Sequence, residues 1–296
     1  MATPQPFRER LTTLKAEYDA CRQGKESLLA LIDTSELSES VFNSNAIENS
    51  TLTLRETERI LLDQQVTSRI TVREIFEAKH LASVSQYVRG KGTGIELSTE
   101  TILLLHTMLI GGIDDAIAGR YRKSGEFVRV GTHIGAAPEE VISRMDRIIL
   151  AYSSDFETYF VDKIAAFHLG FETIHPFNDG NGRIGRMSIN VQLQQLGFPP
   201  VIIRDKEREK YFACFEQYHA EKRTKGMERV ITLALLESLH KRIAYLQGQE
   251  IVPLADFAKT QCKSVHAFLN AARRQTIPAF RERGVWKIGA GYTTEG

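Results

Sequence analysis

Apolar residues recur every three or four positions through most of the first 247 residues, and this spacing constrains the fold more than any other feature. One such series is Phe7, Leu11, Leu14 and Tyr18, and another is Ile142, Met145 and Ile149. A period of about 3.6 residues places these side chains on one face of an α-helix. Two capping boxes, Thr53-Leu-Arg-Glu56 and Thr71-Val-Arg-Glu74, mark expected helix starts. The sequence therefore predicts a mainly α fold.

One stretch breaks the helical pattern. Between Glu126 and Ile134, apolar and polar residues alternate, with Gly131 near the middle. This alternation is typical of a short β-hairpin. The outer edge of an exposed hairpin has unpaired backbone groups that can bind a strand of another chain. The stretch is therefore a candidate docking site.

Composition and charge exclude several classes of protein. Of the 296 residues, 42% are hydrophobic, and 38 Lys and Arg against 37 Asp and Glu leave a net charge of +1. This balance does not indicate a nucleic-acid or membrane-surface role for the chain as a whole. The longest apolar run, from Ile102 to Ile113, is shorter than the roughly 20 residues of a membrane-spanning helix, so we expect a buried helix there.

The cysteines and the N-terminus bear on the location of the protein. Cys21, Cys214 and Cys262 are far apart, which fits neither a disulfide framework nor a metal-binding Cys pair. The first 20 residues contain scattered charges and lack the apolar core of a secretory leader. We therefore expect a cytoplasmic protein that does not bind membranes.

The segment from His175 to Arg186 carries the clearest chemistry. It reads His-Pro-Phe-Asn-Asp-Gly-Asn-Gly-Arg-Ile-Gly-Arg and follows an apolar helical stretch. Pro176 disfavours helix at the residue before it, so we expect His175 at a turn. The glycine-rich loop then opens a second helix, whose free N–H groups form a binding site for phosphate.

Side chains in this segment suit phosphate chemistry. His175 is the one group there whose unperturbed pKa is close to neutral, as a general base requires. Asp179 offers a hard oxygen ligand to the Mg²⁺ that accompanies nucleotide phosphates. Arg183 and Arg186 are three positions apart, on one face of the expected helix, and can contact the same anion.

The same segment resembles the signature of the Fic family, H-P-F-x-(D/E)-G-N-(G/K)-R-x-x-R, at every specified position. The resemblance covers about residues 35–240. The stretch His168–Ile174 is similar to the family's lead-in helix, and Gly119–Val128 is similar to the approach to its target-docking hairpin, or flap. The resemblance implies a Fic-type helical bundle with a short β-hairpin flap around residues 126–134, on which a target protein docks.

Members of this family usually transfer AMP from ATP to a Ser, Thr or Tyr hydroxyl of a protein. The resemblance implies that His175 takes the hydroxyl proton, that Asp179 binds Mg²⁺ on the α- and β-phosphates, and that pyrophosphate leaves. In the phosphotransferase branch a lysine commonly replaces the glycine at position 182, so Gly182 favours AMP transfer. The residues implied to bind the phosphates are Gly180, Asn181, Gly182, Arg183 and Arg186.

Ser44-Asn-Ala-Ile-Glu-Asn49 resembles the family's inhibitory motif, (S/T)-x-x-x-E-(G/N). The resemblance implies that Glu48 pairs with Arg186, which would otherwise hold the γ-phosphate of ATP. Because the motif precedes the catalytic segment, the chain resembles the subgroup that is inhibited by its own N-terminal helix, with Ser44 and Asn49 as further motif residues. In some relatives the same glutamate positions water for removal of AMP, so the resemblance extends to the reverse reaction.

The chain changes character after Gln247-Gly248-Gln249, and we predict two domains, 1–247 and 248–296. From Pro253 onward the pattern reads helix, turn, helix and a β-hairpin at Arg283-Gly284. This order resembles the winged helix-turn-helix of excisionase-like proteins. Residues 249–296 contain seven Lys and Arg and four Asp and Glu, a net charge of +3, so DNA is a candidate partner of this small C-terminal winged-helix-like module.

Two functions of different classes are compatible with these patterns. The first is an ATP-dependent protein adenylyltransferase inhibited by Glu48. The second is a DNA-binding regulator whose Fic domain senses a nucleotide without turnover, which the presence of His175 and Asp179 disfavours. Phosphotransfer is a third hypothesis, disfavoured by Gly182. A homo-oligomer is also compatible with the sequence.

Overall fold

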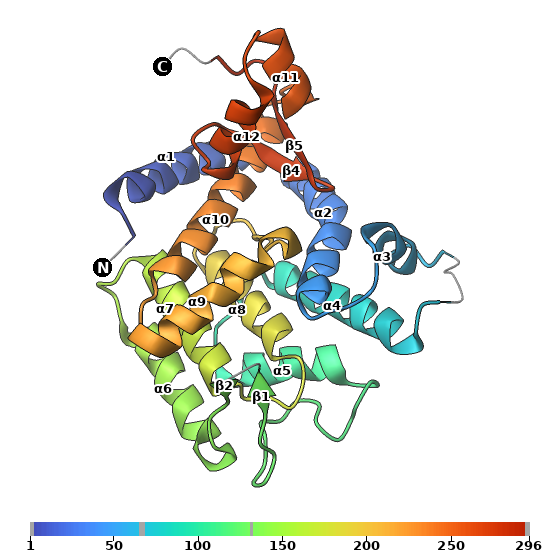
Figure 1. Ribbon diagram of the computed structural model, residues 1–296, viewed down its shortest axis with the longest axis vertical. Coiled ribbons are helices and arrows are strands. Elements are labelled where there is room, and N and C mark those ends of the chain that lie inside the picture. Colours follow the sequence, from blue (N-terminus) through green and yellow to red (C-terminus); the bar gives the residue numbers. More distant parts are fainter. Residues whose placement is uncertain (1–2, 65–68, 131–132, 294–296) are drawn as a thin grey trace. The chain divides into compact units, whose positions relative to one another are not determined.

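The computed structural model describes residues 3–64, 69–130 and 133–293. Helices make up most of the ribbon in Figure 1, which confirms the predicted mainly α fold. The α-helices are α1 (Gln5–Arg22), α2 (Glu26–Ile47), α3 (Leu54–Leu61), α4 (Val72–Lys91), α5 (Thr99–Ile110), α6 (Val141–Ser154), α7 (Phe160–Ile174), α8 (Asn181–Gln195), α9 (Arg208–Glu221), α10 (Lys225–Leu246), α11 (Leu254–Thr260) and α12 (Val265–Arg273). The strands are β1 (Arg129–Val130), β2 (His133–Ile134), β3 (Ile251–Pro253), β4 (Phe280–Glu282) and β5 (Val285–Gly289).

The predicted helix starts at the two capping boxes are confirmed. The Thr53 hydroxyl accepts from the backbone N–H of Glu56, and the Glu56 carboxylate accepts from the backbone N–H of Thr53. Thr71 and Glu74 form the same reciprocal pair at the start of α4. Each box satisfies two backbone donors that a helix end otherwise leaves without partners.

The chain forms two compact units. The first contains residues 1–3 and 40–231, and the second contains residues 4–39 and 232–296. Helix α10 ends at Leu246 and β3 begins at Ile251, so the predicted domain boundary near residue 248 falls between these two elements. That boundary stays a prediction.

In the first unit, α8 lies among α4, α5 and α7 and is buried along most of its length. Its apolar side chains are fully buried at Ile184, Ile189, Val191 and Leu193. Because three helices surround α8, its N-terminus at Asn181 is held in a defined place. The loop between α7 and α8 contains the segment that the sequence singled out.

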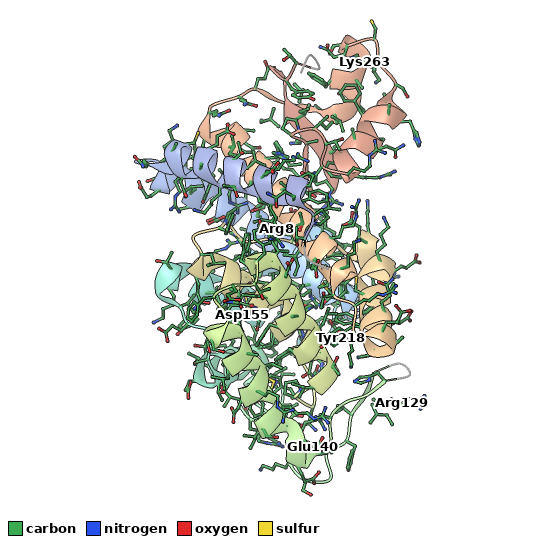
Figure 2. All side chains as sticks on the ribbon, turned by 90° about the vertical axis from the view of Figure 1, so that its left-hand side faces the viewer. Arg8, Arg129, Glu140, Asp155, Tyr218 and Lys263 are labelled. Carbon is green, nitrogen blue, oxygen red and sulfur yellow. The ribbon has the colours of Figure 1, made fainter. Side chains whose placement is uncertain are left out.

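The predicted hairpin is present in the first unit. β1 pairs antiparallel with β2, with Arg129 opposite Ile134 and Val130 opposite His133. Gly131 of the predicted hairpin lies outside the described residues. Arg129 is exposed, and Figure 2 shows its side chain at the outer edge of this unit.

In the second unit, β5 is the central strand of an antiparallel sheet in the order β3-β5-β4. Val252 lies opposite Ile288, and Arg281 lies opposite Trp286. The predicted helices and the predicted hairpin at Arg283-Gly284 are present, whereas the third strand, β3, was not predicted. Together with α11 and α12, the sheet encloses a small apolar core of Leu254, Phe257, Ala258, Phe268, Ala272, Ile277, Ala279 and Ile288.

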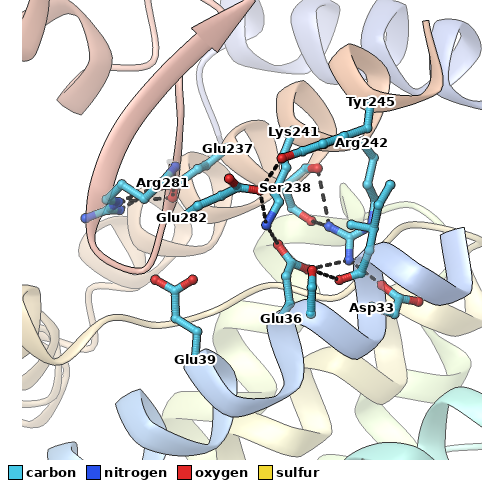
Figure 3. Close-up of polar contacts among 12 residues, drawn as sticks. Asp33, Glu36, Glu39, Glu237, Ser238, Lys241, Arg242, Tyr245, Arg281 and Glu282 are labelled. Atoms are coloured by element: carbon cyan, nitrogen blue, oxygen red, sulfur yellow. Dashed lines mark hydrogen bonds and ion pairs between the residues drawn. The ribbon is translucent and has the colours of Figure 1, made fainter. Parts of the chain in front are cut away.

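The same unit contains a buried network of charged side chains (Figure 3). The Arg242 side chain is 1% exposed and donates to Asp33 Oδ1 at 2.6 Å and to Glu36 Oε2 at 2.7 Å. Nζ of Lys241 lies 3.1 Å from Glu36 Oε1 and 3.1 Å from Glu282 Oε1. Within the second unit these pairs join α2, α10 and β4. Across the described ranges, no helix combines the length and the apolar character needed to cross a membrane.

Candidate active site

Helix α7 ends at Ile174, and His175 follows in the left-handed conformation with a φ of 53°. The N–H of His175 donates to the carbonyl oxygen of Phe171 at 2.9 Å. The turn predicted at this residue is therefore present. For a residue other than glycine, this conformation costs about 1–3 kcal/mol, and such residues concentrate at functional sites.

The imidazole of His175 is held in one tautomer. Nδ1 lies 3.3 Å from the carbonyl oxygen of Glu172, which can only accept a hydrogen bond. We therefore assign the proton of the neutral ring to Nδ1, which leaves the lone pair on Nε2 free. Burial lowers the pKa of His175 to about 4, so the ring is neutral at pH 7. A neutral imidazole with a free Nε2 can accept a proton from a hydroxyl group.

Glu172 places a second titratable group beside His175. Its Oε2 lies 3.7 Å from His175 Nδ1, and its side chain is 12% exposed. Burial, together with the nearby charge of Glu48, raises the pKa of Glu172 to about 8, so this carboxyl is protonated at neutral pH. The residue was not among those predicted for the site, although its place three positions before His175 on one helix is a signal of contact.

The loop between α7 and α8 is closed by the side chain of Asn181. Its Oδ1 accepts from the N–H of Phe177 and its Nδ2 donates to the carbonyl oxygen of Phe177, both at 2.8 Å. Gly180 precedes the helix with a φ of 81°, a conformation that suits glycine. This arrangement directs the free N–H groups at the start of α8, which we call the anion-binding end of α8, away from the helix body.

His106 of α5 supports the same loop and was not predicted. Its Nδ1 accepts from the N–H of Gly119 at 3.0 Å, so Nε2 carries the proton and donates to the carbonyl oxygen of Asp179 at 3.0 Å. The ring also stacks on Phe177 with centroids 3.7 Å apart. Burial lowers the pKa of His106 to about 4, which keeps this donor and acceptor pattern at neutral pH.

The carboxylate of Asp179, the predicted magnesium ligand, is held by arginines. Arg73 Nη2 lies 2.5 Å from Oδ2, and Arg183 Nη2 lies 3.0 Å from Oδ1. Glu77 pairs with both arginines, at 3.0 Å from Arg73 and 3.4 Å from Arg183. Arg73 and Glu77 come from α4, and no feature of the sequence connects them with residue 179.

Asp179 suits a magnesium ion whose other ligands are substrate phosphates and water. Within the described part of the chain there is no group of three or more His, Cys, Asp or Glu side chains that could hold a metal ion. Mg²⁺ is commonly bound through one or two carboxylates together with substrate phosphates and water. A single hard oxygen donor beside a helix N-terminus that is suited to phosphate meets this requirement.

Glu48 and Arg186, which the sequence predicts to pair, are in contact. Arg186 Nη2 lies 2.8 Å from Glu48 Oε1, and the arginine side chain is 6% exposed. Arg186 also donates to the Ser44 hydroxyl at 3.0 Å and to the Ser44 carbonyl oxygen at 2.8 Å. Asn49, with a φ of 68°, accepts from Arg208 Nη2 at 2.7 Å. The three residues of the predicted inhibitory motif are thus all engaged within the first unit.

The Glu48 carboxylate also lies against the anion-binding end of α8. A Cβ atom placed on Gly182 would overlap Glu48 Oε1. The absence of a side chain at residue 182 therefore lets an anionic group approach the helix backbone, and in this structure that group is Glu48. A phosphate would require the same space.

The two arginines that the sequence predicted to contact one anion have different partners within the protein. Arg186 contacts Ser44 and Glu48, whereas Arg183 contacts Asp179 and Glu77. Both side chains are buried, at 6% and 4% exposure. They flank the anion-binding end of α8, each with its own partners.

Comparisons with known proteins relate this region to one family. Residues 96–193 match the Fic/DOC family. The protein adenylyltransferase Fic of Nematostella vectensis is 33% identical over 181 residues, which are 60% of this chain and 42% of that protein. The chain thus spans less than half the length of this curated relative.

Solved structures extend the likeness to the fold of almost the whole chain. A Fic domain-containing signaling protein from Bacteroides thetaiotaomicron aligns with a TM-score of 0.72 at 22% identity, over 81% of this chain and 98% of that chain. A Fic family protein from Desulfovibrio desulfuricans aligns with a TM-score of 0.64 at 18% identity, over 99% of this chain and 98% of that chain. The chain therefore has the mainly helical fold of Fic proteins, and its residues 96–193 match the Fic/DOC family.

Proposed function

We propose that the protein is an ATP-dependent adenylyltransferase that transfers AMP to a Ser, Thr or Tyr hydroxyl of another protein. Relatives named protein adenylyltransferase support this activity at the level of the family. The observation that carries the proposal is the position of His175. Its neutral imidazole, with a free Nε2, stands at one end of a loop whose other end is the anion-binding end of α8.

In the proposed reaction the hydroxyl oxygen of the target attacks the α-phosphorus of ATP. The bond between the α-phosphorus and the bridging oxygen of the β-phosphate breaks, and pyrophosphate leaves. His175 Nε2 accepts the hydroxyl proton, because Nδ1 already carries one. The remaining residues position and neutralise the phosphates, as is usual for transfer at phosphorus.

The phosphates would bind at the anion-binding end of α8, where Gly180 and Gly182 leave the backbone N–H groups accessible. Arg183 and Arg186 flank this point and would contact the outer phosphates. Asp179 would hold the Mg²⁺ that neutralises phosphate charge. A lysine at residue 182 is typical of the phosphotransferase branch, so Gly182 supports transfer of AMP.

Glu48 would inhibit the enzyme by competing with ATP. It pairs with Arg186 and occupies the space over Gly182 that a phosphate needs. Glu48 must therefore leave before ATP can bind in the productive position. With Glu48 near the anion-binding end of α8, the reverse reaction is part of the same proposal. In it, water attacks the phosphorus of the attached AMP, the bond from phosphorus to the target oxygen breaks, that oxygen takes up a proton, and AMP is released.

The target would dock on the β1–β2 hairpin. Phe127, just before β1, and Ile134, in β2, are both 64% exposed and offer apolar contacts. The hairpin is joined to the end of α7 by a bond from Ala136 N–H to the Ile174 carbonyl oxygen at 3.0 Å. A segment bound along the hairpin would therefore be held close to His175.

The test is labelling with ATP that carries its label on the α-phosphate. Glu48→Gly should increase incorporation into protein by roughly tenfold or more, because it removes a charged competitor of the phosphates. The double variant Glu48→Gly/His175→Ala should lose this labelling. ATP labelled on the γ-phosphate should label neither variant.

The outcomes separate the competing functions. Label from the γ-phosphate would establish phosphotransfer instead. If Glu48→Gly labels no more than the wild type, the inhibitory role of Glu48 is wrong. Release of AMP from purified modified protein by the wild type, and not by Glu48→Gly, would establish the reverse reaction.

A further inference from the structure

Arg122 is a buried arginine whose side chain bonds to main-chain oxygens. It is 4% exposed and lies in the stretch between α5 and the β1–β2 hairpin. Nε donates to His175 O at 2.8 Å, and Nη1 donates to Glu126 O at 2.8 Å. Nη2 donates to Ala136 O at 2.6 Å and to Ile174 O at 3.2 Å.

These four oxygens belong to two functional segments. Glu126 and Ala136 flank the hairpin on which we propose that the target docks, and Ile174 and His175 form the end of α7. The backbone N–H of Arg122 adds a fifth bond, to the Pro176 carbonyl oxygen at 2.9 Å. One side chain therefore ties both ends of the hairpin to the turn that carries the proposed base.

The hydrogen bond from Arg122 to His175 is made at a residue with an unfavourable backbone conformation. His175 is in the left-handed conformation, which residues other than glycine rarely adopt, and its carbonyl oxygen is held by Arg122 Nε. The direction of the imidazole follows from the backbone conformation of its own residue. Loss of the Arg122 bond would free the carbonyl and allow the ring to turn.

The packing around this junction is tight. A Cβ atom placed on Gly135 would lie 3.1 Å from His175 Cβ, 3.2 Å from Ile174 O and 3.0 Å from Val128 Cγ2. The hairpin and the catalytic turn are therefore in direct contact beside the Arg122 guanidinium. A small displacement of one segment must move the other.

We propose that Arg122 is a positioning residue that holds His175 in its left-handed conformation and keeps it in register with the target-docking hairpin. This inference builds on the function proposed above. Arg122 acts through main-chain atoms, so its role is geometric. A lysine has three donors on one nitrogen and cannot reach oxygens on two segments in the way that a planar guanidinium does.

If Arg122 acts through geometry, a positive charge alone at residue 122 should not preserve activity. In the 296-residue protein carrying Glu48→Gly, we expect Arg122→Lys and Arg122→Gln each to lower the single-turnover rate of auto-modification at saturating ATP by about 10²-fold. The affinity for ATP, measured by calorimetry, should change less than twofold. The Arg122 substitutions should therefore lower the maximal rate and leave the KM for ATP nearly unchanged.

Arg120→Gln is the matched control. Arg120 lies two residues before Arg122. Its Nη1 and Nη2 each donate to the carboxylate of Glu126 at 2.8 Å and not to the end of α7. Its replacement removes a neighbouring cation and should leave the turnover rate within about threefold of the Glu48→Gly protein. Gly135→Ala is a second probe of the same junction, and we expect it to lower turnover at unchanged ATP affinity.

Amide hydrogen exchange gives a readout that does not depend on activity. In the wild-type background, Arg122→Lys should accelerate exchange at the amides of residues 135–136 and 175, while exchange in α8 stays unchanged. If Glu48→Gly shows no labelling at all, the proposed function fails, and the exchange result still decides the positioning role. Any of three results for Arg122→Lys would overturn the inference: full turnover, a loss of ATP affinity that parallels the loss of turnover, or unchanged exchange at these amides. If Arg122 variants do not fold, an unaffected Gly135→Ala protein would overturn it.

Discussion

Nη2 of Arg186 lies 2.8 Å from Glu48 Oε1, and the same nitrogen donates to the carbonyl oxygen of Ser44 at 2.8 Å. The arginine is almost fully buried, whereas the Glu48 side chain is 39% exposed. The cation is therefore fixed, and the anion is the partner that can move away. In the proposed enzyme, the phosphates of ATP replace a carboxylate of the same sign of charge.

Two variants at this pair should affect ATP binding to different degrees. We expect Glu48→Gly to tighten ATP binding by roughly tenfold or more, because hydrogen bonds to charged groups contribute about 1.5–3 kcal/mol. Ser44→Ala removes one neutral acceptor and leaves the Ser44 carbonyl oxygen, so its effect should be smaller. Calorimetric titration with ATP and Mg²⁺ measures both. Equal or reversed effects would contradict the competition between Glu48 and phosphate.

The pH dependence of the reaction should reflect the burial of His175. Because the pKa of the buried imidazole is lowered to about 4, the ring keeps its free Nε2 well below pH 6.5. The nearby charge of Glu48 opposes this shift, so its removal lowers the pKa further. In Glu48→Gly, kcat/KM for ATP should show no inflection near pH 6.5 from the loss of a base. Circular dichroism at each pH controls for unfolding, and an inflection near pH 6.5 would exclude this state of His175.

Arg73 should compete with Mg²⁺ for Asp179. Its guanidinium lies 2.5 Å from Oδ2, but its side chain is 58% exposed, so the pair contributes at most about 1 kcal/mol. Arg73→Ala should lower the Mg²⁺ concentration required for half-maximal ATP binding, by up to about fivefold. Lys79→Ala, on the same helix and paired with Asp63, is the control and should have no effect. A higher Mg²⁺ requirement in Arg73→Ala would show that the arginine assists binding.

The second unit should lose stability in acid through Glu36. Burial alone would raise the pKa of this carboxyl, but Arg242 and Lys241 outweigh burial and lower it from 4.5 to about 2. The stabilisation from the ionised group is therefore fully present above pH 4.5 and is lost as the pH falls toward 2. It amounts to about 3 kcal/mol in the free energy of unfolding.

Urea unfolding between pH 7 and pH 2.5 measures this contribution. In Glu36→Gln the free energy of unfolding should be lower at neutral pH, and it should fall less steeply with acid than in the wild type. Asp63→Asn, at an exposed carboxylate, should follow the wild-type curve. Parallel curves for Glu36→Gln and the wild type would contradict the lowered pKa.

Local features of the structure could be predicted because neighbouring residues produce them. The capping boxes at Thr53 and Thr71 involve residues three positions apart, and the turn at His175 follows from the proline after it. The hairpin at 129–134 follows from alternation along one short stretch. Each of these signals acts among a few consecutive residues, so it can be recognised without knowing how the helices pack.

The contacts around the loop between α7 and α8 could not be predicted in this way. Arg73 bonds to Asp179 over a separation of 106 residues, His106 bonds to the carbonyl of Asp179 over 73 residues, and Arg122 bonds to the carbonyl of His175 over 53 residues. Two of these acceptors are main-chain oxygens, which every residue type has, so the sequence does not indicate that they accept a hydrogen bond. The pairing of Glu48 with Arg186 was expected from a family motif and not from spacing.

The sequence alone determined the helical class, the helix starts at the two capping boxes, the loop between α7 and α8, and the types of side chain available for phosphate chemistry. Tertiary structure decided which side chains those groups meet: it paired Arg183 with Asp179 and Arg186 with Glu48, placed Arg73 against Asp179, and brought Arg122 to the carbonyl oxygen of His175. The physical reason is that helix and turn formation depends on a few consecutive residues, whereas burial and pairing depend on which helices pack together. The burial that lowers the pKa of His175 arises only from that packing, whereas its tautomer is set locally by the carbonyl oxygen of Glu172.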